Sequence, residues 1–195
     1  MKRMILASGS PRRKELLQML EVPFEVLVSD TKEVITKNEP AEVTKELSYQ
    51  KAMAVAGQVE EGIIIGADTV VSIDGKILGK PADTEEAREM IYKLQGKSHM
   101  VYTGVTVIAK SGDMVSASSF AEGTKVNVAP MTENEIEAYI STDEPYDKAG
   151  AYGIQGLFGK FIEGIKGDYF NVVGLPVYCL NRLLSDFLGK HLTEL

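Results

Sequence analysis

The sequence predicts an α/β fold in which a mixed central sheet is flanked by helices. Short apolar runs typical of strands alternate with amphipathic segments of helical period along one continuous chain. Prolines and glycines stand between these segments, where helices and strands are expected to end. A chain of 195 residues suits one compact domain, so we expect a single domain over residues 1–195.

Three strands and two helices are predicted in the first part of the chain. The apolar run at residues 4–8 indicates a short buried strand, and the serine-proline pair at residues 10–11 is typical of a helix start. Alternating apolar residues over 24–28 predict a second strand. An amphipathic helix is expected over residues 40–57, followed by a central strand from residue 63 that ends or continues at Asp68.

The rest of the chain predicts further strands and three more helices. Asp74-Gly75 is typical of a hairpin turn, and residues 100–128 alternate as a β-meander does. Residues 147–169 are rich in glycine and aromatic side chains and are interpreted as an irregular segment. The helices are predicted at residues 84–95, 133–140 and 176–188.

The charge balance limits the class of partner. The chain has 21 Lys+Arg against 28 Asp+Glu, which gives a formal net charge of -7. An acidic protein repels polyanions, so a duplex nucleic acid is disfavoured as a partner. A small anionic ligand remains compatible with this charge, because a local cluster of basic groups in a cleft overcomes a mildly acidic global field.

Several features favour the cytoplasm. The single cysteine, Cys179, lies in an apolar stretch and is interpreted as a buried hydrophobic residue rather than half of a disulfide. The apolar run at residues 4–7 is too short for the core of a signal peptide. Since no stretch approaches the length of a membrane span, we expect no membrane partner.

The segment from Ser8 to Arg13 has the composition of a polyphosphate site. It combines a small-residue turn, a helix start and the guanidinium groups of Arg12 and Arg13. It matches neither the Walker loop nor the dinucleotide glycine pattern. A phosphate site and a solvated helix start both remain open at this stage.

Two carboxylates are candidates for catalysis and for binding a divalent cation. Asp68 stands at the end of an apolar strand, where α/β sheets commonly bind ligands. Glu33, close to Asp30, is the second candidate oxygen ligand. The structural alternatives are a strand cap for Asp68 and a solvated loop acid for Glu33. The spacing of His99 and His191 does not indicate a metal site.

Two lysines and one loop complete the candidates. Lys51 and Lys80 carry point charges suited to phosphate, and Lys80 has limited backbone freedom because Pro81 follows it. Each alone is more typical of a surface lysine. Tyr152 and Gln155 lie in a glycine-rich loop and offer a stacking ring and an amide for a nucleobase edge. A structural loop with an aromatic plug is the alternative.

Six motifs follow one another along nearly the whole length of the chain. They are LASGSPRRKELL at residues 6–17, GADTVV at 66–71, LGKP at 78–81, the segment 144–156, GDY at 167–169 and VGLP at 173–176. Taken in this order, the motifs resemble the Maf family. That resemblance implies a fold similar to that of inosine triphosphate pyrophosphatases, hydrolysis of a nucleoside triphosphate to the monophosphate and pyrophosphate, and a homodimer.

The resemblance also implies roles for individual residues. Asp68 matches the family's catalytic acid, as proton acceptor or as a carboxylate bound to metal. The other polar pocket positions of the family match Ser8, Arg13, Glu33, Lys51 and Lys80. Arg12, Thr69 and Gln155 match the branch that prefers dTTP and UTP over 7-methyl-GTP.

These roles lead to a mechanistic hypothesis. Mg²⁺ or Mn²⁺, held by Glu33 and Asp68, orients a water for in-line attack on the α-phosphorus of a pyrimidine nucleotide, canonical or modified. Two other functions remain open. One is nucleotidyl transfer to an alcohol or sugar acceptor, and the other is a nucleotide-sensing regulator, because members of the family are linked to septum formation.

Overall fold

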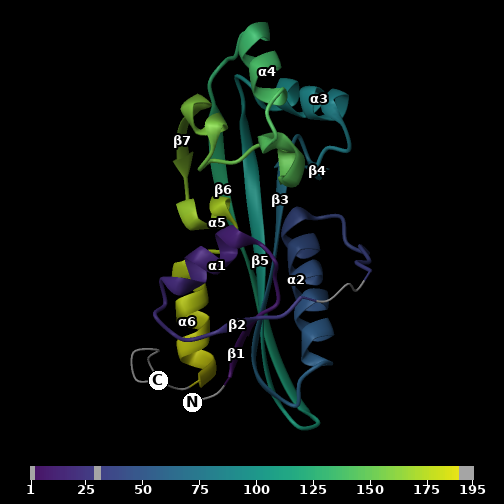
Figure 1. Cartoon of the computed structure of the whole chain (residues 1–195), viewed down its shortest axis with the longest axis vertical. Helices are drawn as coiled ribbons and strands as arrows, with labels where there is room; N and C mark the ends of the chain where they lie inside the picture. Colours follow the sequence, from purple (N-terminus) through teal and green to yellow (C-terminus); the bar gives the residue numbers. More distant parts are fainter. Residues whose placement is uncertain (1–2, 29–31, 189–195) are drawn as a thin grey trace. The chain divides into compact units, whose positions relative to one another are not determined.

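The structure is a computed structural model that describes residues 3–28 and 32–188 (Figure 1). In this part of the chain seven strands form a mixed sheet in the order β2-β1-β3-β5-β6-β7, with β4 paired to β3. Helices accompany the sheet, so the predicted fold class is confirmed. No helix among these residues is long and apolar enough to cross a membrane.

The chain divides into two compact units. The first comprises residues 1–68, 103–122 and 174–195, and the second comprises residues 69–102 and 123–173. The long strands β3 (Glu61–Ile73), β5 (Ser98–Ser111) and β6 (Met114–Val128) contribute residues to both units. The single domain expected over residues 1–195 stays a prediction.

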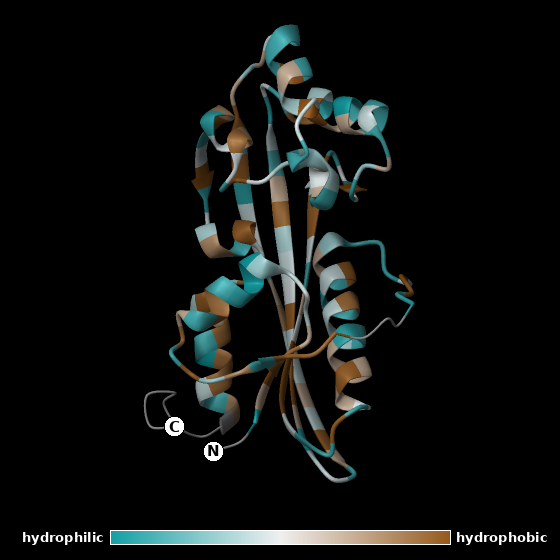
Figure 2. Ribbon diagram, in the orientation of Figure 1, coloured by the Kyte–Doolittle hydropathy of each residue, from teal (hydrophilic) through white to brown (hydrophobic). Residues whose placement is uncertain are grey.

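The first unit is built on parallel strand pairs. Strand β1 (Met4–Leu6) pairs in parallel with β2 (Glu25–Val26) and with β3, and Leu6 lies opposite Ile65. All three residues of β1 are buried, as expected of a strand covered on both faces. The helices of this unit are α1 (Pro11–Gln18), α2 (Pro40–Ala56) and α6 (Val177–Leu188). Apolar and polar residues alternate along α2 and α6 (Figure 2).

Two glycines allow α2 to approach the sheet closely. A Cβ atom at Gly66 of β3 would clash with the Ser48 carbonyl oxygen and with Ala52, and one at Gly104 of β5 would clash with the backbone of Thr44. These glycines are therefore needed for the approach of the helix. Because these glycines have no side chain, α2 lies close enough to the sheet for Lys51 to reach Asp68 on β3.

The second unit combines antiparallel strands with helices. The hairpin predicted at Asp74-Gly75 is confirmed, because β3 pairs antiparallel with β4 (Lys76–Leu78) and both turn residues have positive φ. Helices α3 (Thr84–Leu94) and α4 (Glu133–Ile140) agree with the predicted ranges, and Thr132 and Glu135 form a capping box that starts α4. The strand and helix bounds after α4 are β7 (Ile162–Lys166) and α5 (Tyr169–Val173).

The glycine-rich segment is more regular than the sequence indicated. It contains three 3₁₀ turns, at Glu144–Asp147, Ala149–Ala151 and Leu157–Phe161, and continues into β7, which pairs antiparallel with β6. Tyr139, Tyr152 and Phe158 are buried in the core of this unit. The glycine-rich sequence did not predict these elements, because local strand and turn propensities are weak and tertiary packing fixes the elements instead.

Candidate active site

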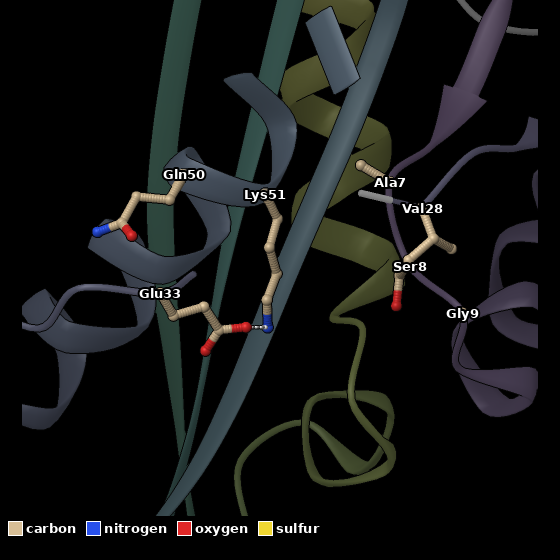
Figure 3. Close-up of a pocket in the computed structure, with 7 residues that line it drawn as sticks. All are labelled: Ala7, Ser8, Gly9, Val28, Glu33, Gln50 and Lys51. Atoms are coloured by element: carbon tan, nitrogen blue, oxygen red, sulfur yellow. Dashed lines mark ion pairs between the residues drawn. The ribbon is translucent and has the colours of Figure 1, made fainter. Parts of the chain in front are cut away.

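The parallel pairing of β1 and β3 builds one end of a pocket in the first unit. Because Leu6 lies opposite Ile65 and the Ala7 amide donates to the Ile65 carbonyl oxygen, the residues directly after β1 run beside Ala67 and Asp68 of β3. Asp68 lies within β3, which continues to Ile73, so the expectation that it stands at the end of a strand is wrong. The pocket is lined by Ala7, Ser8, Gly9, Val28, Glu33, Gln50 and Lys51 (Figure 3).

At the centre of the site, one ammonium group joins two carboxylates. The Lys51 Nζ atom lies 2.5 Å from Asp68 Oδ1 and 3.1 Å from Glu33 Oε1. The Asp68 side chain is 13% exposed and that of Glu33 is 46% exposed, so ligands reach the cluster from the Glu33 side. The three side chains come from α2, from β3 and from the segment before α2.

Arg13 bonds to Ser8, one of the residues that line the pocket. Its Nε donates to the Gly174 carbonyl oxygen at 2.9 Å, and its Nη1 donates to Ser8 Oγ at 3.2 Å. Burial lowers the pKa of the Arg13 guanidinium, Asp68 opposes this shift and Arg12 adds to it. The Arg13 guanidinium therefore interacts electrostatically with both Asp68 and Arg12, so basic groups gather here within an acidic chain.

The start of α1 has the geometry that its sequence predicted. Ser10 is the N-cap, its side chain accepts from the Arg13 amide, and Pro11 occupies the first turn. The Ser10 amide donates to Ser8 Oγ at 3.3 Å. These bonds fix the turn that presents Ser8 to the pocket.

The nine predicted site residues fall into two groups. Six lie in the first unit, and five of these, Ser8, Arg13, Glu33, Lys51 and Asp68, are joined by the contacts described above. The second unit contains Thr69, Lys80 and Gln155. Thr69 is half-buried on β3, Lys80 is exposed directly after β4, and Gln155 is exposed in a turn between two glycines.

The Tyr152 ring packs inside the protein and does not lie exposed for a nucleobase to stack on it. Tyr152 is 5% exposed, its hydroxyl lies 2.6 Å from His99 Nε2, and its ring packs against Phe158. The ring is therefore the aromatic plug of the loop, and a role in stacking a nucleobase is wrong for it. Asp30 and His191 lie outside the described residues.

The carboxylates can accept a hard cation. Within residues 3–28 and 32–188 no group of three or more His, Cys, Asp or Glu side chains is arranged around a metal position. Mg²⁺ in phosphate-handling sites is commonly held by one or two carboxylates together with substrate oxygens and water. Glu33 and Asp68 already converge on one positive centre, the Lys51 ammonium, so this pair fits that requirement.

The anchor of Arg13 was not predicted from the sequence. Gly174 lies in the VGLP motif, 161 residues after Arg13 in the chain, and it acts through its carbonyl oxygen. A backbone contact over this separation leaves no signal in residue type or spacing. Only the motif itself could have drawn attention to the segment.

A family model described as Maf-like protein matches residues 3–187 of this sequence. This chain belongs to the Maf family. Among its relatives, a protein of Bacillus cytotoxicus named dTTP/UTP pyrophosphatase is 52% identical over 96% of each chain. A protein of the same name from Bacillus cereus is 48% identical, again over 96% of each chain.

The Maf family assignment agrees with the resemblance found in the motifs. The Ham1 protein of Staphylococcus aureus has a solved structure that covers 66% of this chain and 72% of its own, with a TM-score of 0.47 and 15% identity. The assignment to the Maf family rests on sequence and does not depend on that likeness.

Proposed function

We propose that this chain is a cytoplasmic, metal-dependent nucleoside triphosphate pyrophosphatase that converts dTTP and UTP to the monophosphate and pyrophosphate. The observation that carries the proposal is the convergence of Glu33 and Asp68 on the Lys51 ammonium, at a pocket that Ser8, Glu33 and Lys51 help to line. Relatives about half identical over nearly the full chain bear the name of this activity. Pyrimidine nucleotides with modified bases belong to the same proposed substrate class.

The cationic side chains neutralise the triphosphate. In cleavage between the α and β phosphates, charge accumulates on the departing pyrophosphate, and guanidinium and ammonium groups stabilise it most strongly where water is scarce. Arg13 is held by the Gly174 carbonyl oxygen, so it reaches substrate with little further ordering. Arg12, Lys51 and Lys80 add charge, and Ser8 adds a hydroxyl donor.

Glu33 and Asp68 would hold the divalent cation, Mg²⁺ or Mn²⁺, which would polarise phosphate oxygens and offset the charge of the substrate. The Lys51 ammonium lies against the same two carboxylates, so it is placed where it would contact a phosphate oxygen of the substrate.

Asp68 is assigned to the attacking water. Its carboxylate accepts the proton of that water directly or contributes through the cation, and the oxygen forms a bond to the α-phosphorus as the bond to the bridging oxygen breaks. Both roles need an ionised Asp68 at the pocket edge. Its low exposure and its contact with Lys51 favour a fixed position for the carboxylate.

The pyrimidine preference is assigned to Arg12, Thr69 and Gln155. Gln155 supports this assignment because it is exposed and its amide both donates and accepts, as a uracil or thymine edge requires. The 3₁₀ turns on both sides limit the motion of its loop. A homodimer, implied by the family resemblance, stays a prediction that light scattering on the purified protein would test.

A substrate panel tests the proposal. Pyrophosphate release is measured from dTTP, UTP, CTP, GTP and 7-methyl-GTP with Mg²⁺ or Mn²⁺, alongside the Asp68→Asn variant. We expect metal-dependent turnover of dTTP and UTP that the variant loses while its unfolding transition is kept. Turnover that survives in Asp68→Asn would overturn the assignment of this residue, and nucleotide binding without any turnover would favour a regulator.

A further inference from the structure

Glu33 lies on a segment without helix or strand. Residues 32–38 form no regular element, and every one of them is exposed. An exposed irregular segment gains little from burial, so its conformation depends on specific hydrogen bonds. A carboxylate that must meet Asp68 at one cation therefore needs an anchor nearby.

Gln50 provides that anchor through both ends of its side-chain amide. The Val34 amide donates to Gln50 Oε1 at 2.9 Å, and Gln50 Nε2 donates to the Val34 carbonyl oxygen at 2.6 Å. This pair of bonds fixes the backbone of the residue directly after Glu33. It acts as one rung of a sheet ladder would, with the side chain in place of a strand.

A second anchor lies one helical turn away. The Thr36 amide donates to Glu46 Oε2 at 2.8 Å, and the Thr36 hydroxyl donates to Glu46 Oε1 at 2.5 Å. The hydrogen bonds from Thr36 lower the pKa of the Glu46 carboxyl. Glu46 and Gln50 are four residues apart on α2 and so share one face of the helix.

The contacts place the segment along α2 in a fixed register. On α2, Lys51 contacts Glu33, Gln50 contacts Val34, and Glu46 contacts Thr36. The segment thus runs against the direction of the helix, with Glu33 opposite Lys51. In Figure 3 the Gln50 amide points away from Lys51, toward the segment rather than into the carboxylate cluster.

We infer that Gln50 is a positioning residue that sets the affinity of the site for its divalent cation by holding Glu33 in register with Lys51 and Asp68. The inference rests on the proposed function, because it takes Glu33 as a ligand of the cation. Groups that orient a metal ligand through hydrogen bonds change metal affinity by about 10- to 100-fold when they are lost. Gln50 itself touches neither the cation nor the substrate in this role.

The test is Gln50→Met, which keeps the length of the side chain and removes both bonds to Val34. Its matched control is Gln58→Met, because Gln58 is exposed and its side-chain amide donates to the nearby Ala54 carbonyl oxygen, within the same helix end. A third variant, Glu46→Met, removes the more distant anchor. Mn²⁺ binding without nucleotide is measured for all three from the paramagnetic resonance of the free ion, and Val34 amide exchange reports the local bond.

We expect Gln50→Met to weaken Mn²⁺ binding about ten-fold, with faster exchange at the Val34 amide. Glu46→Met should weaken binding less, and Gln58→Met should match the wild-type protein. In turnover assays Gln50→Met should require more Mn²⁺ for half-maximal rate than the wild-type protein or Gln58→Met.

Three results would overturn the inference. The first is wild-type Mn²⁺ affinity in Gln50→Met, and the second is equal weakening in Gln50→Met and Gln58→Met. The third is a wild-type protein that binds no Mn²⁺. Failure of the proposed function looks different: the wild-type protein then hydrolyses no nucleotide, while the loss of Mn²⁺ binding in Gln50→Met still supports the positioning role.

Discussion

In the first unit the ionisable side chains meet at an accessible pocket, whereas in the second unit His99 and Tyr152 meet inside the core. Glu33 is 46% exposed and shares the Lys51 ammonium with Asp68. His99 is 3% exposed, and its ring packs edge-on against that of Tyr152, with centroids 5.3 Å apart. The contrast teaches that the buried pair of His99 and Tyr152 supports a loop, while the charged cluster of the first unit is placed to act on a ligand.

The largest expected effect is the loss of catalytic rate in Lys51→Met, which removes the centre of the charged cluster in the first unit. Removing the ammonium takes away a charge aimed at the substrate phosphates, and such groups are worth about 10²- to 10³-fold in kcat. Steady-state rates with dTTP measure the loss. Lys93→Met, in an exposed pair on α3, is the matched control and should keep wild-type rates. Equal rates in both variants would remove Lys51 from the site.

The second effect is a pH dependence of stability that comes from the second unit. Burial lowers the pKa of His99 to about 4, from an ordinary value of 6.5. Between these two values the unfolded chain binds a proton that the folded chain does not, so stability is complete above pH 6.5 and falls as the pH drops toward 4.

The expected size of this pH effect is about 3 kcal/mol across the whole window. Urea unfolding at several pH values measures it, with His99→Asn as the comparison that should lose the contribution. The free energy of unfolding should fall more steeply with acid in the wild-type protein. Equal slopes in the two proteins would show that His99 titrates normally.

Gly66→Ala tests how the packing of α2 against β3 supports the site in the first unit. The added methyl group meets the Ser48 carbonyl oxygen and Ala52 on α2, so the helix must shift. Overpacking of this kind costs about 2 kcal/mol, and it should also lower kcat because α2 carries Lys51. Thermal unfolding and dTTP turnover check both effects, with Gly164→Ala, where a Cβ meets no atom within 4 Å, as the control.

Tyr152→Phe has the smallest expected effect. It removes the hydroxyl that bonds His99 and keeps the ring against Phe158, so it should cost about 1 kcal/mol of unfolding free energy. If Tyr152 only supports its loop, kcat should stay near wild type. A large loss of kcat with unchanged stability would give Tyr152 a direct role after all.

Local signals predicted much of the fold and of the first-unit site. Ser10 and Pro11 mark the start of α1, and Asp74-Gly75 forms the hairpin, as expected, whereas β3 continues past Asp68 to Ile73. These features follow from residue type and spacing within a few positions. Phosphate and metal chemistry is likewise confined to a few residue types, so its candidates stand out in a sequence.

Long-range contacts explain what the sequence did not reveal. Arg13 bonds to a carbonyl oxygen 161 residues away, and Gln50 recognises the backbone of Val34, which any residue presents. The burial of Tyr152 depends on the packed core of the second unit. The glycine-rich loop sequence alone was compatible with an exposed ring and with a buried ring. Strand β7 was missed for the same reason, since its pairing with β6 fixes it.

The position of bond cleavage tests the central claim most directly. Turnover of dTTP in ¹⁸O-labelled water with Mg²⁺ or Mn²⁺, followed by mass spectrometry of both products, shows which phosphorus the water attacks. Attack at the α-phosphorus places the label in dTMP and leaves the pyrophosphate unlabelled, which is the predicted result. Label in pyrophosphate or in inorganic phosphate, with unlabelled nucleotide, would contradict the proposed reaction.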